Sequence, residues 1–139
     1  MEVHTTRILT DLMTADKRFV VVVGGARAGK SVQIAYWFIT KLMAEKLELT
    51  IARQTRVAAR DSVWPKAMKF ALEQCGLWNS DSWNATTMTF TFENGSAIQV
   101  IGASDEQKLR GREADYVWIN EANELDYKEF MALNTRCRR

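Results

Sequence analysis

The sequence predicts an α/β fold in which helices cover the faces of a mostly parallel sheet. Short apolar, β-branched runs alternate with amphipathic runs of helical length, in the order strand, helix, strand, helix, hairpin, strand, helix. The 139 residues have the size of one domain, and no internal repeat or Pro/Gly/Ser-rich linker divides them. We therefore expect a single domain over residues 1–139.

Composition excludes several classes of site. The net charge of +2, from 19 basic and 17 acidic residues, argues neither for nor against nucleic acid. Cys75 and Cys137 have no metal-ligand spacing and form no disulfide framework, so reduced thiols are expected. His4 is the only histidine, which excludes a histidine metal centre or a Ser-His triad. The purest apolar run, 19–23, is far below the ~20 residues that cross a bilayer.

The first part of the chain contains two predicted strands and two predicted helices. Thr5–Ala15 has the spacing of a short amphipathic helix. Phe19–Val23 is apolar on both faces, as a strand in the middle of a parallel sheet must be. A helix is predicted over Lys30–Lys46, and Leu49–Arg53 is a second strand. The apolar stripe of that helix is Ile34, Ala35, Phe38, Ile39, Leu42 and Met43.

Capping residues predict the next helix. Asp61 or Ser62 can cap its start, and Pro65 is tolerated in a first turn. The helix runs to Cys75, with Gly76 as the stop.

A β-hairpin is predicted after this helix. Thr86–Phe92 alternates in polarity, and Asn94-Gly95 is the strongest short signal for a two-residue turn. The return strand is then Ser96–Gly102, with Phe92 opposite Ala97. Both faces of this hairpin carry apolar groups, so we expect both to be partly covered.

The last strand and helix have clear local signals. Tyr116–Ile119 is an apolar strand. Leu125-Asp126 announces a helix, with Glu129 placed for a capping box and Phe130 for a hydrophobic staple onto Leu125.

A phosphate-binding loop lies between the first strand and its helix. Glycines let backbone N–H groups point at phosphate oxygens, and the start of the following helix adds partial positive charge. Lys30 would reach the β- and γ-phosphates of ATP, and the Ser31 hydroxyl would ligate Mg²⁺. The residues that match G-x-x-x-x-G-K-S are Gly24, Gly25, Ala26, Arg27, Ala28, Gly29, Lys30 and Ser31.

Arg27 has two interpretations. Inside the loop it can move onto the γ-phosphate and stabilise transition-state charge as an arginine finger in cis. The alternative is a solvated side chain at the crest of the loop.

A second half-site is predicted where the last strand ends in Asn120-Glu121. Glu121 falls where a general base would polarise the attacking water, the alternative being an N-cap or a surface charge. Asn120 occupies the position of a carboxylate that orients magnesium, and its neutral amide is a weaker acceptor. About ninety residues separate Lys30 from Glu121 and contain another strand between the two motifs, which suits the additional-strand, catalytic-glutamate (ASCE) class of P-loop NTPases.

With both motifs placed, the chain from about 18 to 139 resembles the large subunit of a tailed-phage terminase of the PBSX-like type. The ordered strings that carry the resemblance are Gly24-Gly25 with Gly29-Lys30-Ser31, Ala52-Arg53-Gln54-Thr55, Arg60-Asp61-Ser62-Val63, Asn94-Gly95-Ser96-Ala97-Ile98, Lys108-Leu109-Arg110-Gly111, and Trp118-Ile119-Asn120-Glu121-Ala122-Asn123-Glu124-Leu125.

The resemblance implies a P-loop ATPase that moves double-stranded DNA into an empty capsid in the cytoplasm of a bacterial host. Such motors work as a ring on the portal, with a small terminase subunit delivering DNA. The family's coupling segment and C-terminal metal-dependent nuclease would lie beyond Arg139, so we expect an incomplete domain without nuclease activity. A fragment, a remnant gene and one piece of a split protein are all consistent with this.

Several positions stay ambiguous. Many relatives place the loop arginine at the position of Ala26. Arg53 and Arg110 would contact nucleotide or DNA, couple subunits, or lie solvated in loops. The basic tail that starts at Arg136 suits a helix C-terminus. The tryptophans that would either stack on bases or pack in the core are Trp64, Trp78 and Trp83.

Two rival functions remain open from sequence. One is another P-loop motor, such as a helicase-like ATPase. The other is a non-catalytic module that binds nucleotide without turning it over.

Overall fold

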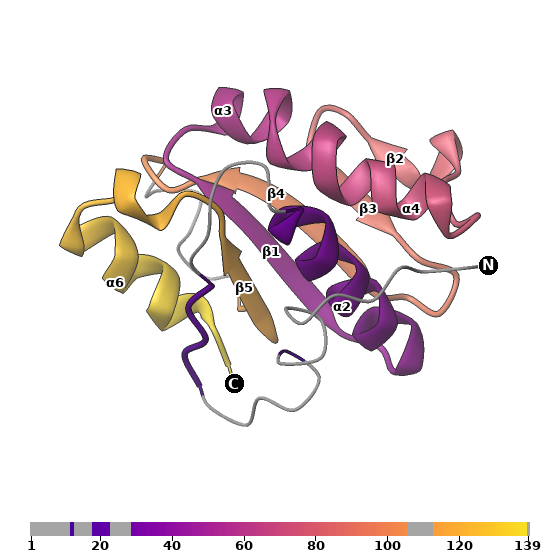
Figure 1. Ribbon diagram of the computed structural model, residues 1–139, viewed down its shortest axis with the longest axis horizontal. Helices are drawn as coiled ribbons and strands as arrows, with labels where there is room; N and C mark the ends of the chain where they lie inside the picture. Colours follow the sequence, from indigo (N-terminus) through magenta and orange to yellow (C-terminus); the bar gives the residue numbers. More distant parts are fainter. Residues whose placement is uncertain (1–11, 13–17, 23–28, 106–112, 139) are drawn as a thin grey trace.

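The computed structural model describes residues 12, 18–22, 29–105 and 113–138 (Figure 1). Its centre is a five-stranded sheet in the order β2-β3-β4-β1-β5. Strands β4, β1 and β5 are parallel, whereas β2, β3 and β4 are antiparallel. The strands are β1 (Glu48–Arg53), β2 (Trp83–Asn84), β3 (Thr89–Thr91), β4 (Ala97–Gly102) and β5 (Tyr116–Ile119).

Helices cover both faces of this sheet, as the sequence predicts. The helical segments are α2 (Lys30–Ala44), α3 (Arg56–Asp61), the π-helix η1 (Trp64–Lys69), α4 (Phe70–Gln74), the 3₁₀ turns η2 (Ser80–Ser82) and η3 (Ala122–Glu124), and α6 (Tyr127–Arg136). The main core lies under α2 and the α3–η1–α4 segment, and Leu133 of α6 packs against the opposite face. The fold is therefore a layered α/β structure.

The predicted helix over Lys30–Lys46 is α2, which ends two residues earlier, at Ala44. Four of the six residues in its predicted stripe are buried, whereas Ile34 is half-buried and Met43 is 53% exposed. The buried members are Ala35, Phe38, Ile39 and Leu42. The lead-in helix over Thr5–Ala15 lies outside the described residues, apart from Leu12.

The predicted central strand Phe19–Val23 is wrong where the structure describes it. Residues 18–22 form no strand, and Phe19 and Val21 are 57% and 83% exposed. The middle of the parallel part of the sheet is β1, which pairs with β4 on one side and β5 on the other. An apolar, β-branched run indicates a tendency to pair, but it does not specify which strand will be its partner.

The helical segment that runs to Gln74 starts close to the predicted position: η1 begins at Trp64, with Val63 as its N-cap and Pro65 in its first turn as predicted. A separate short helix, α3, precedes it, which the sequence does not predict.

Thr55 caps α3, its Oγ1 accepting from Ala58 N at 3.1 Å. Asp61 instead accepts from Arg60, and this hydrogen bond lowers the pKa of the Asp61 carboxyl. Ser62 Oγ donates to Ala58 O at 2.6 Å, so neither predicted cap binds a following amide.

The predicted end of this helical segment is confirmed. Gly76 adopts φ 70°, and its N–H bonds Glu73 O at 3.1 Å. Leu77 N then reaches back to Leu72 O at 2.9 Å, the pattern of a Schellman motif.

The hairpin forms, but its register differs by one residue from the prediction. Phe90 lies opposite Ile98, and Thr91, rather than Phe92, lies opposite Ala97. Phe92 N bonds Ser96 O at 2.8 Å, and Gly95 adopts φ 89°, so the loop has three residues instead of two. A three-residue loop needs a left-handed residue at its end, which glycine supplies.

The hairpin loop also closes the end of α2. Ser96 Oγ donates to Leu42 O at 2.6 Å and to Glu45 O at 3.0 Å, and it accepts from Leu47 N at 3.0 Å. Asn94 Nδ2 donates to Leu42 O at 2.8 Å. These side chains satisfy carbonyls that a helix C-terminus leaves without intrahelical partners.

Helix α6 begins as predicted. Asp126 Oδ1 accepts from Glu129 N at 2.8 Å, and Glu129 Oε1 accepts from Asp126 N at 3.0 Å. This reciprocal capping box is confirmed. Strand β5 also has its predicted bounds. Among the helices that the structure describes, none is long and apolar enough to span a lipid bilayer.

Candidate functional site

The two predicted half-sites meet at one edge of the sheet. Helix α2 begins near the edge where the parallel strands β1, β4 and β5 end (Figure 1). Asn120 directly follows β5, and its backbone N–H bonds Ala52 O at 2.9 Å, extending the ladder by one residue. Its side chain then donates from Nδ2 to Ser31 Oγ, in the first turn of α2, at 3.4 Å. Residues 89 positions apart are thus neighbours.

The start of α2 has the backbone expected of a phosphate loop. Gly29 is the N-cap with φ 67° and ψ 11°, a left-handed conformation that favours glycine. It offers no side chain to cap the first turn, whose amides are the kind of donors that bind an anion at a helix N-terminus. Lys30 and Ser31 are half-buried at this position. The rest of the predicted loop, Gly24–Ala28 with Arg27, lies outside the described residues.

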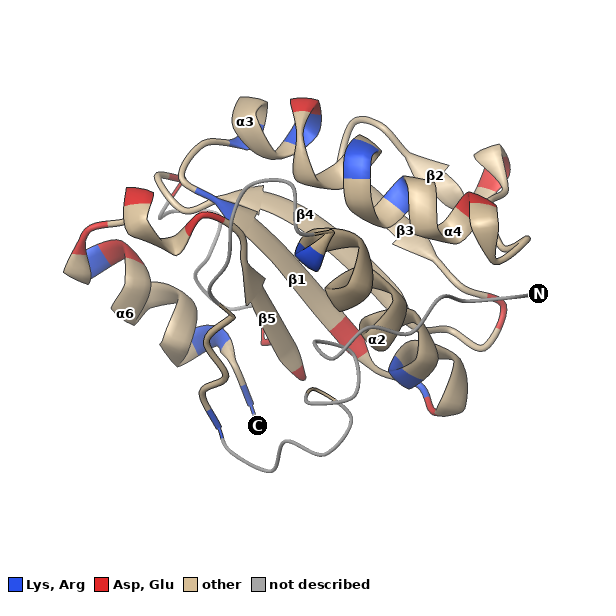
Figure 2. Cartoon of the chain, in the orientation of Figure 1, with Lys and Arg blue, Asp and Glu red and all other residues tan. Residues whose placement is uncertain are grey.

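Glu121 stands at the exposed end of β5 in an uncommon conformation. Its φ of 57° and ψ of 54° are left-handed, which costs about 1–2 kcal/mol in a residue with a side chain. The 3₁₀ turn η3 follows at once, and Glu124 N bonds Glu121 O at 3.0 Å. Figure 2 shows acidic residues, drawn in red, in this turn. Asn120 and Glu121 are therefore the two residues that directly follow β5.

An ion pair joins the last residue of this turn to the end of β1. Arg53, the last residue of β1, makes a bidentate ion pair with Glu124 at 3.1 and 3.2 Å. Arg53 is ambiguous from sequence, and Glu124 is only part of the resemblance. The pairing of β1 with β5 brings the end of β1 near the turn after β5, but the two residues are 71 positions apart in the sequence.

Comparison with known proteins identifies the family. The family model described as phage terminase large subunit matches residues 16–139. This chain belongs to the phage terminase large subunit family.

Individual terminases agree with that assignment. The PBSX phage terminase large subunit of Bacillus subtilis (strain 168) is 27% identical over 124 residues, which cover 88% of this chain and 28% of that protein. The large terminase of a thermophilic bacteriophage matches with a TM-score of 0.79 and 19% identity, over 96% of this chain and 35% of that one. A structure of the same thermophilic phage terminase in complex with ADP gives a TM-score of 0.73 at the same coverage and identity. The chain thus has the large-terminase fold and spans about a third or less of these relatives.

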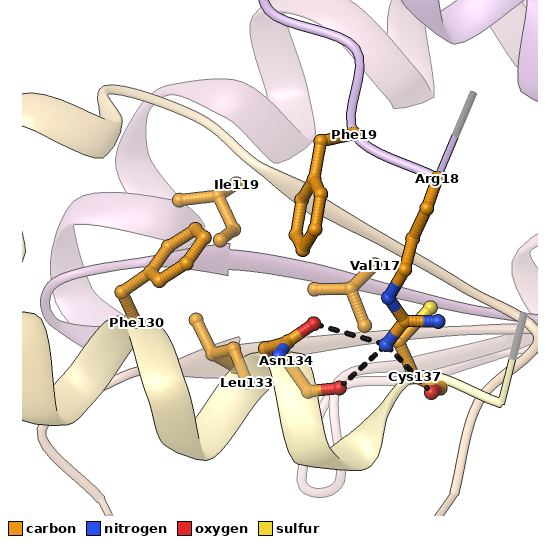
Figure 3. A pocket seen from close by; sticks show the side chains of 8 residues that line it. All are labelled: Arg18, Phe19, Val117, Ile119, Phe130, Leu133, Asn134 and Cys137. Atoms are coloured by element: carbon orange, nitrogen blue, oxygen red, sulfur yellow. Dashed lines mark hydrogen bonds between the residues drawn. The ribbon is translucent and has the colours of Figure 1, made fainter.

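The terminase chain has a small apolar pocket between β5, α6 and residues 18–19 (Figure 3). Its volume of about 70 Å³ is well below the ~300 Å³ at which small-molecule sites begin. Arg18 Nη2 closes one side by donating to Asn134 Oδ1 at 2.9 Å and to the carbonyls of Asn134 and Cys137 at 3.2 and 3.4 Å. Arg18 therefore caps the end of α6, where a cation is favoured.

The predicted tryptophan cluster packs in the terminase core. Trp64 is 5% exposed and stacks on Trp83 with a centroid distance of 4.2 Å. Trp78 stacks on Phe90 at 5.6 Å. These contacts favour core packing over base stacking.

Arg136 ends α6 as expected for a basic residue, but its side chain is buried at 5% exposure. Its Nε donates to Thr50 Oγ1 at 2.9 Å and one Nη donates to Gln99 Oε1 at 2.7 Å. The residue therefore ties α6 to β1 and β4 across the sheet. Arg110 lies outside the described residues.

Metal ligands do not cluster in the part of the chain that the structure describes: no group of three or more His, Cys, Asp or Glu side chains comes together there. An Mg²⁺ held by one hydroxyl and by phosphate oxygens needs no such group, because magnesium commonly keeps several waters.

Proposed function

We propose that this chain binds ATP with Mg²⁺ at the Ser31–Asn120 edge and forms part of the ATP-hydrolysing motor of a DNA-packaging terminase. The observation that carries the proposal is the 3.4 Å contact between the first turn of α2 and the end of β5. A P-loop NTPase needs these two segments beside one triphosphate. Support comes from the family match and from the related terminase of the thermophilic phage, which has been solved with ADP and with ATP-γ-S.

In this proposal, backbone amides of Gly24–Ser31 hold the phosphates and the Lys30 ammonium balances charge on the β- and γ-phosphates. The Ser31 hydroxyl would be a direct ligand of Mg²⁺, and Asn120 would act indirectly by orienting Ser31. The metal, when bound, withdraws charge from the phosphate oxygens. Arg27 supplies a second cation to the γ-phosphate in cis.

Glu121 is the proposed general base. Its carboxylate orients a water and accepts its proton as the water oxygen attacks the γ-phosphorus. The bond from the γ-phosphorus to the bridging oxygen breaks, and ADP and phosphate leave. The exposure of Glu121 at the strand end leaves room for a water beside it.

The whole protein would act on double-stranded DNA. By its family we propose that it works in the bacterial host cytoplasm as a ring on the portal protein, with a small terminase subunit delivering DNA. The segment that couples hydrolysis to DNA movement and the nuclease are proposed to belong to parts of the relatives that this chain does not cover.

Calorimetry with ATP-Mg tests the site. Lys30→Ala should weaken binding on the order of ten- to a hundredfold, since a hydrogen bond from an ammonium to a phosphate is worth about 1.5–3 kcal/mol. Lys66→Ala, which removes an exposed lysine of η1, is the matched control and should bind as the parent does. Equal affinity of Lys30→Ala and the parent would refute the phosphate-loop assignment.

A further inference from the structure

Strand β1 ends in a guanidinium that joins three segments of the chain. Arg53 Nε lies 3.1 Å from Glu124 Oε1, and Nη2 lies 3.2 Å from Glu124 Oε2. Its Nη1 donates to Ser62 Oγ at 2.6 Å, and the Ser62 hydroxyl donates onward to Ala58 O at 2.6 Å. One side chain thus connects β1, the end of α3 and the turn after β5.

The turn that Arg53 holds is short and starts at Glu121. Glu124 N bonds Glu121 O at 3.0 Å, and Leu125 N bonds Ala122 O at 3.1 Å. Glu124 and Glu121 are therefore linked directly by a backbone hydrogen bond within one turn. The other side of Glu121 is fixed by β5, where Asn120 N bonds Ala52 O.

The Arg53–Glu124 pair has the geometry in which an ion pair fixes a conformation. An exposed, single-contact pair contributes little because solvent screens it and both side chains stay mobile. Here both carboxylate oxygens are engaged by a planar fork, and the side chains are only 18% and 34% exposed. Such a fork adds orientation as well as attraction, and lysine has no equivalent.

Glu121 needs this kind of support. Left-handed backbone in a residue with a side chain persists only where surrounding contacts over-determine it. Without the pair, the turn is free to relax toward right-handed or extended backbone, which would redirect the Glu121 side chain.

We propose that Arg53 is a positioning residue, which holds Glu121 in its left-handed conformation through the ion pair with Glu124. The proposal rests on the proposed function, because it assigns the activation of water to Glu121. Arg53 acts through Glu124 and the turn, and its contribution falls on the hydrolysis step rather than on nucleotide affinity.

Hydrolysis and binding measured on the same protein separate these roles. Arg53→Gln and Glu124→Gln should each lower the single-turnover rate constant on the order of ten- to a hundredfold, the cost of a slightly misplaced catalytic group. The Kd for ATP-Mg should change by less than about threefold, because the lost interaction serves the transition state. The exchanged pair, Arg53→Glu with Glu124→Arg, should recover part of the rate.

Each other result has a definite meaning. Unchanged hydrolysis in both single variants, beside a loss in Glu121→Gln, would overturn the positioning role and leave the proposed function intact. Unchanged hydrolysis in Glu121→Gln would remove the proposed base itself. Weakened ATP binding in Arg53→Gln, with a normal rate for bound nucleotide, would make Arg53 a nucleotide contact and overturn the proposal.

Hydrogen exchange provides a readout that needs no turnover. The amides of Glu124 and Leu125 should exchange on the order of tenfold faster in each single variant, since the turn opens more often. The double variant Arg53→Glu with Glu124→Arg, which swaps the two charges, should restore the protection of these two amides. Glu73→Gln, at an exposed position of α4, is the control and should leave exchange in this turn unchanged. Equal protection of these two amides in Arg53→Gln and the parent would overturn the proposal.

Discussion

Asn120 Nδ2 lies 3.4 Å from Ser31 Oγ, and this contact joins the first turn of α2 to the end of β5. An amide that donates to the Ser31 oxygen occupies one of its two lone pairs and leaves the other for Mg²⁺. A carboxylate at position 120 would instead accept the Ser31 hydroxyl proton and leave the oxygen lone pairs to the metal. The chemical identity of residue 120 thus bears directly on metal affinity.

Asn120→Asp should therefore tighten the magnesium dependence of ATP binding. The carboxylate supplies an acceptor for Ser31 and a negative charge near the cation, and we expect a several-fold lower Mg²⁺ midpoint, about 1 kcal/mol. Calorimetric measurement of ATP binding at a series of Mg²⁺ concentrations, with the total ATP concentration held fixed, gives this midpoint.

Asn123→Asp is the control for that change, because it adds the same charge in η3, outside the contact between Asn120 and Ser31. It should move the Mg²⁺ midpoint less than Asn120→Asp does. If both variants titrate like the parent, residue 120 does not influence the metal.

A second prediction concerns the hairpin loop that closes α2. Ser96 is fully buried, and its hydroxyl bonds two carbonyls and one amide. Ser96→Ala leaves these groups without their partner and should lower the free energy of unfolding by about 2–3 kcal/mol. Urea denaturation followed by circular dichroism measures the change.

Ser104→Ala is the control for Ser96→Ala, because it makes the same change at an exposed serine just beyond β4. We expect its free energy of unfolding to stay within about 0.5 kcal/mol of the parent value. A Ser96→Ala protein as stable as the Ser104→Ala protein would show that the loop does not fix the end of α2.

Local signals explain which elements the sequence predicts correctly. The bounds of β5, the Asp126–Glu129 capping box and the stop at Gly76 depend on neighbours within a few residues. Caps are also local, yet the predicted cap is wrong: Asp61 and Ser62 suit a cap by residue type as well as Thr55 does, but of these three only Thr55 caps a helix, α3, which the sequence does not predict. Asp61 is engaged by Arg60 instead.

Features that depend on distant segments are the ones that the sequence predicts wrongly or leaves open. The register of the hairpin follows from a three-residue loop whose Asn94 and Ser96 also bind α2. The burial of Arg136 depends on polar side chains, Thr50 and Gln99, that lie on one face of two different strands. Sequence spacing gives no access to such contacts.

The candidate site likewise has a part that the sequence predicts and a part that it does not. Its two halves are expected at one sheet edge because parallel strands end together, and the Ser31–Asn120 contact agrees with that expectation. The Arg53–Glu124 pair is not expected, since charged residues near strand ends are common and pairing depends on side-chain direction. The roles of Lys30 and Glu121 stay predictions that kinetics must test.

The last prediction concerns the backbone strain at Glu121 and its effect on the free energy of unfolding. At φ 57° a residue with a side chain is strained, whereas glycine is not. Glu121→Gly should therefore raise the free energy of unfolding by about 1 kcal/mol while removing the proposed base, so stability and hydrolysis would change in opposite directions. Met88→Gly is the informative comparison: Met88 has φ 51° but is 2% exposed, so its loss from the core should outweigh the relief of strain and destabilise the protein. Chemical denaturation of both variants decides the matter, and a Glu121→Gly protein less stable than the parent would mean that the glutamate side chain contributes more to folding than its conformation costs.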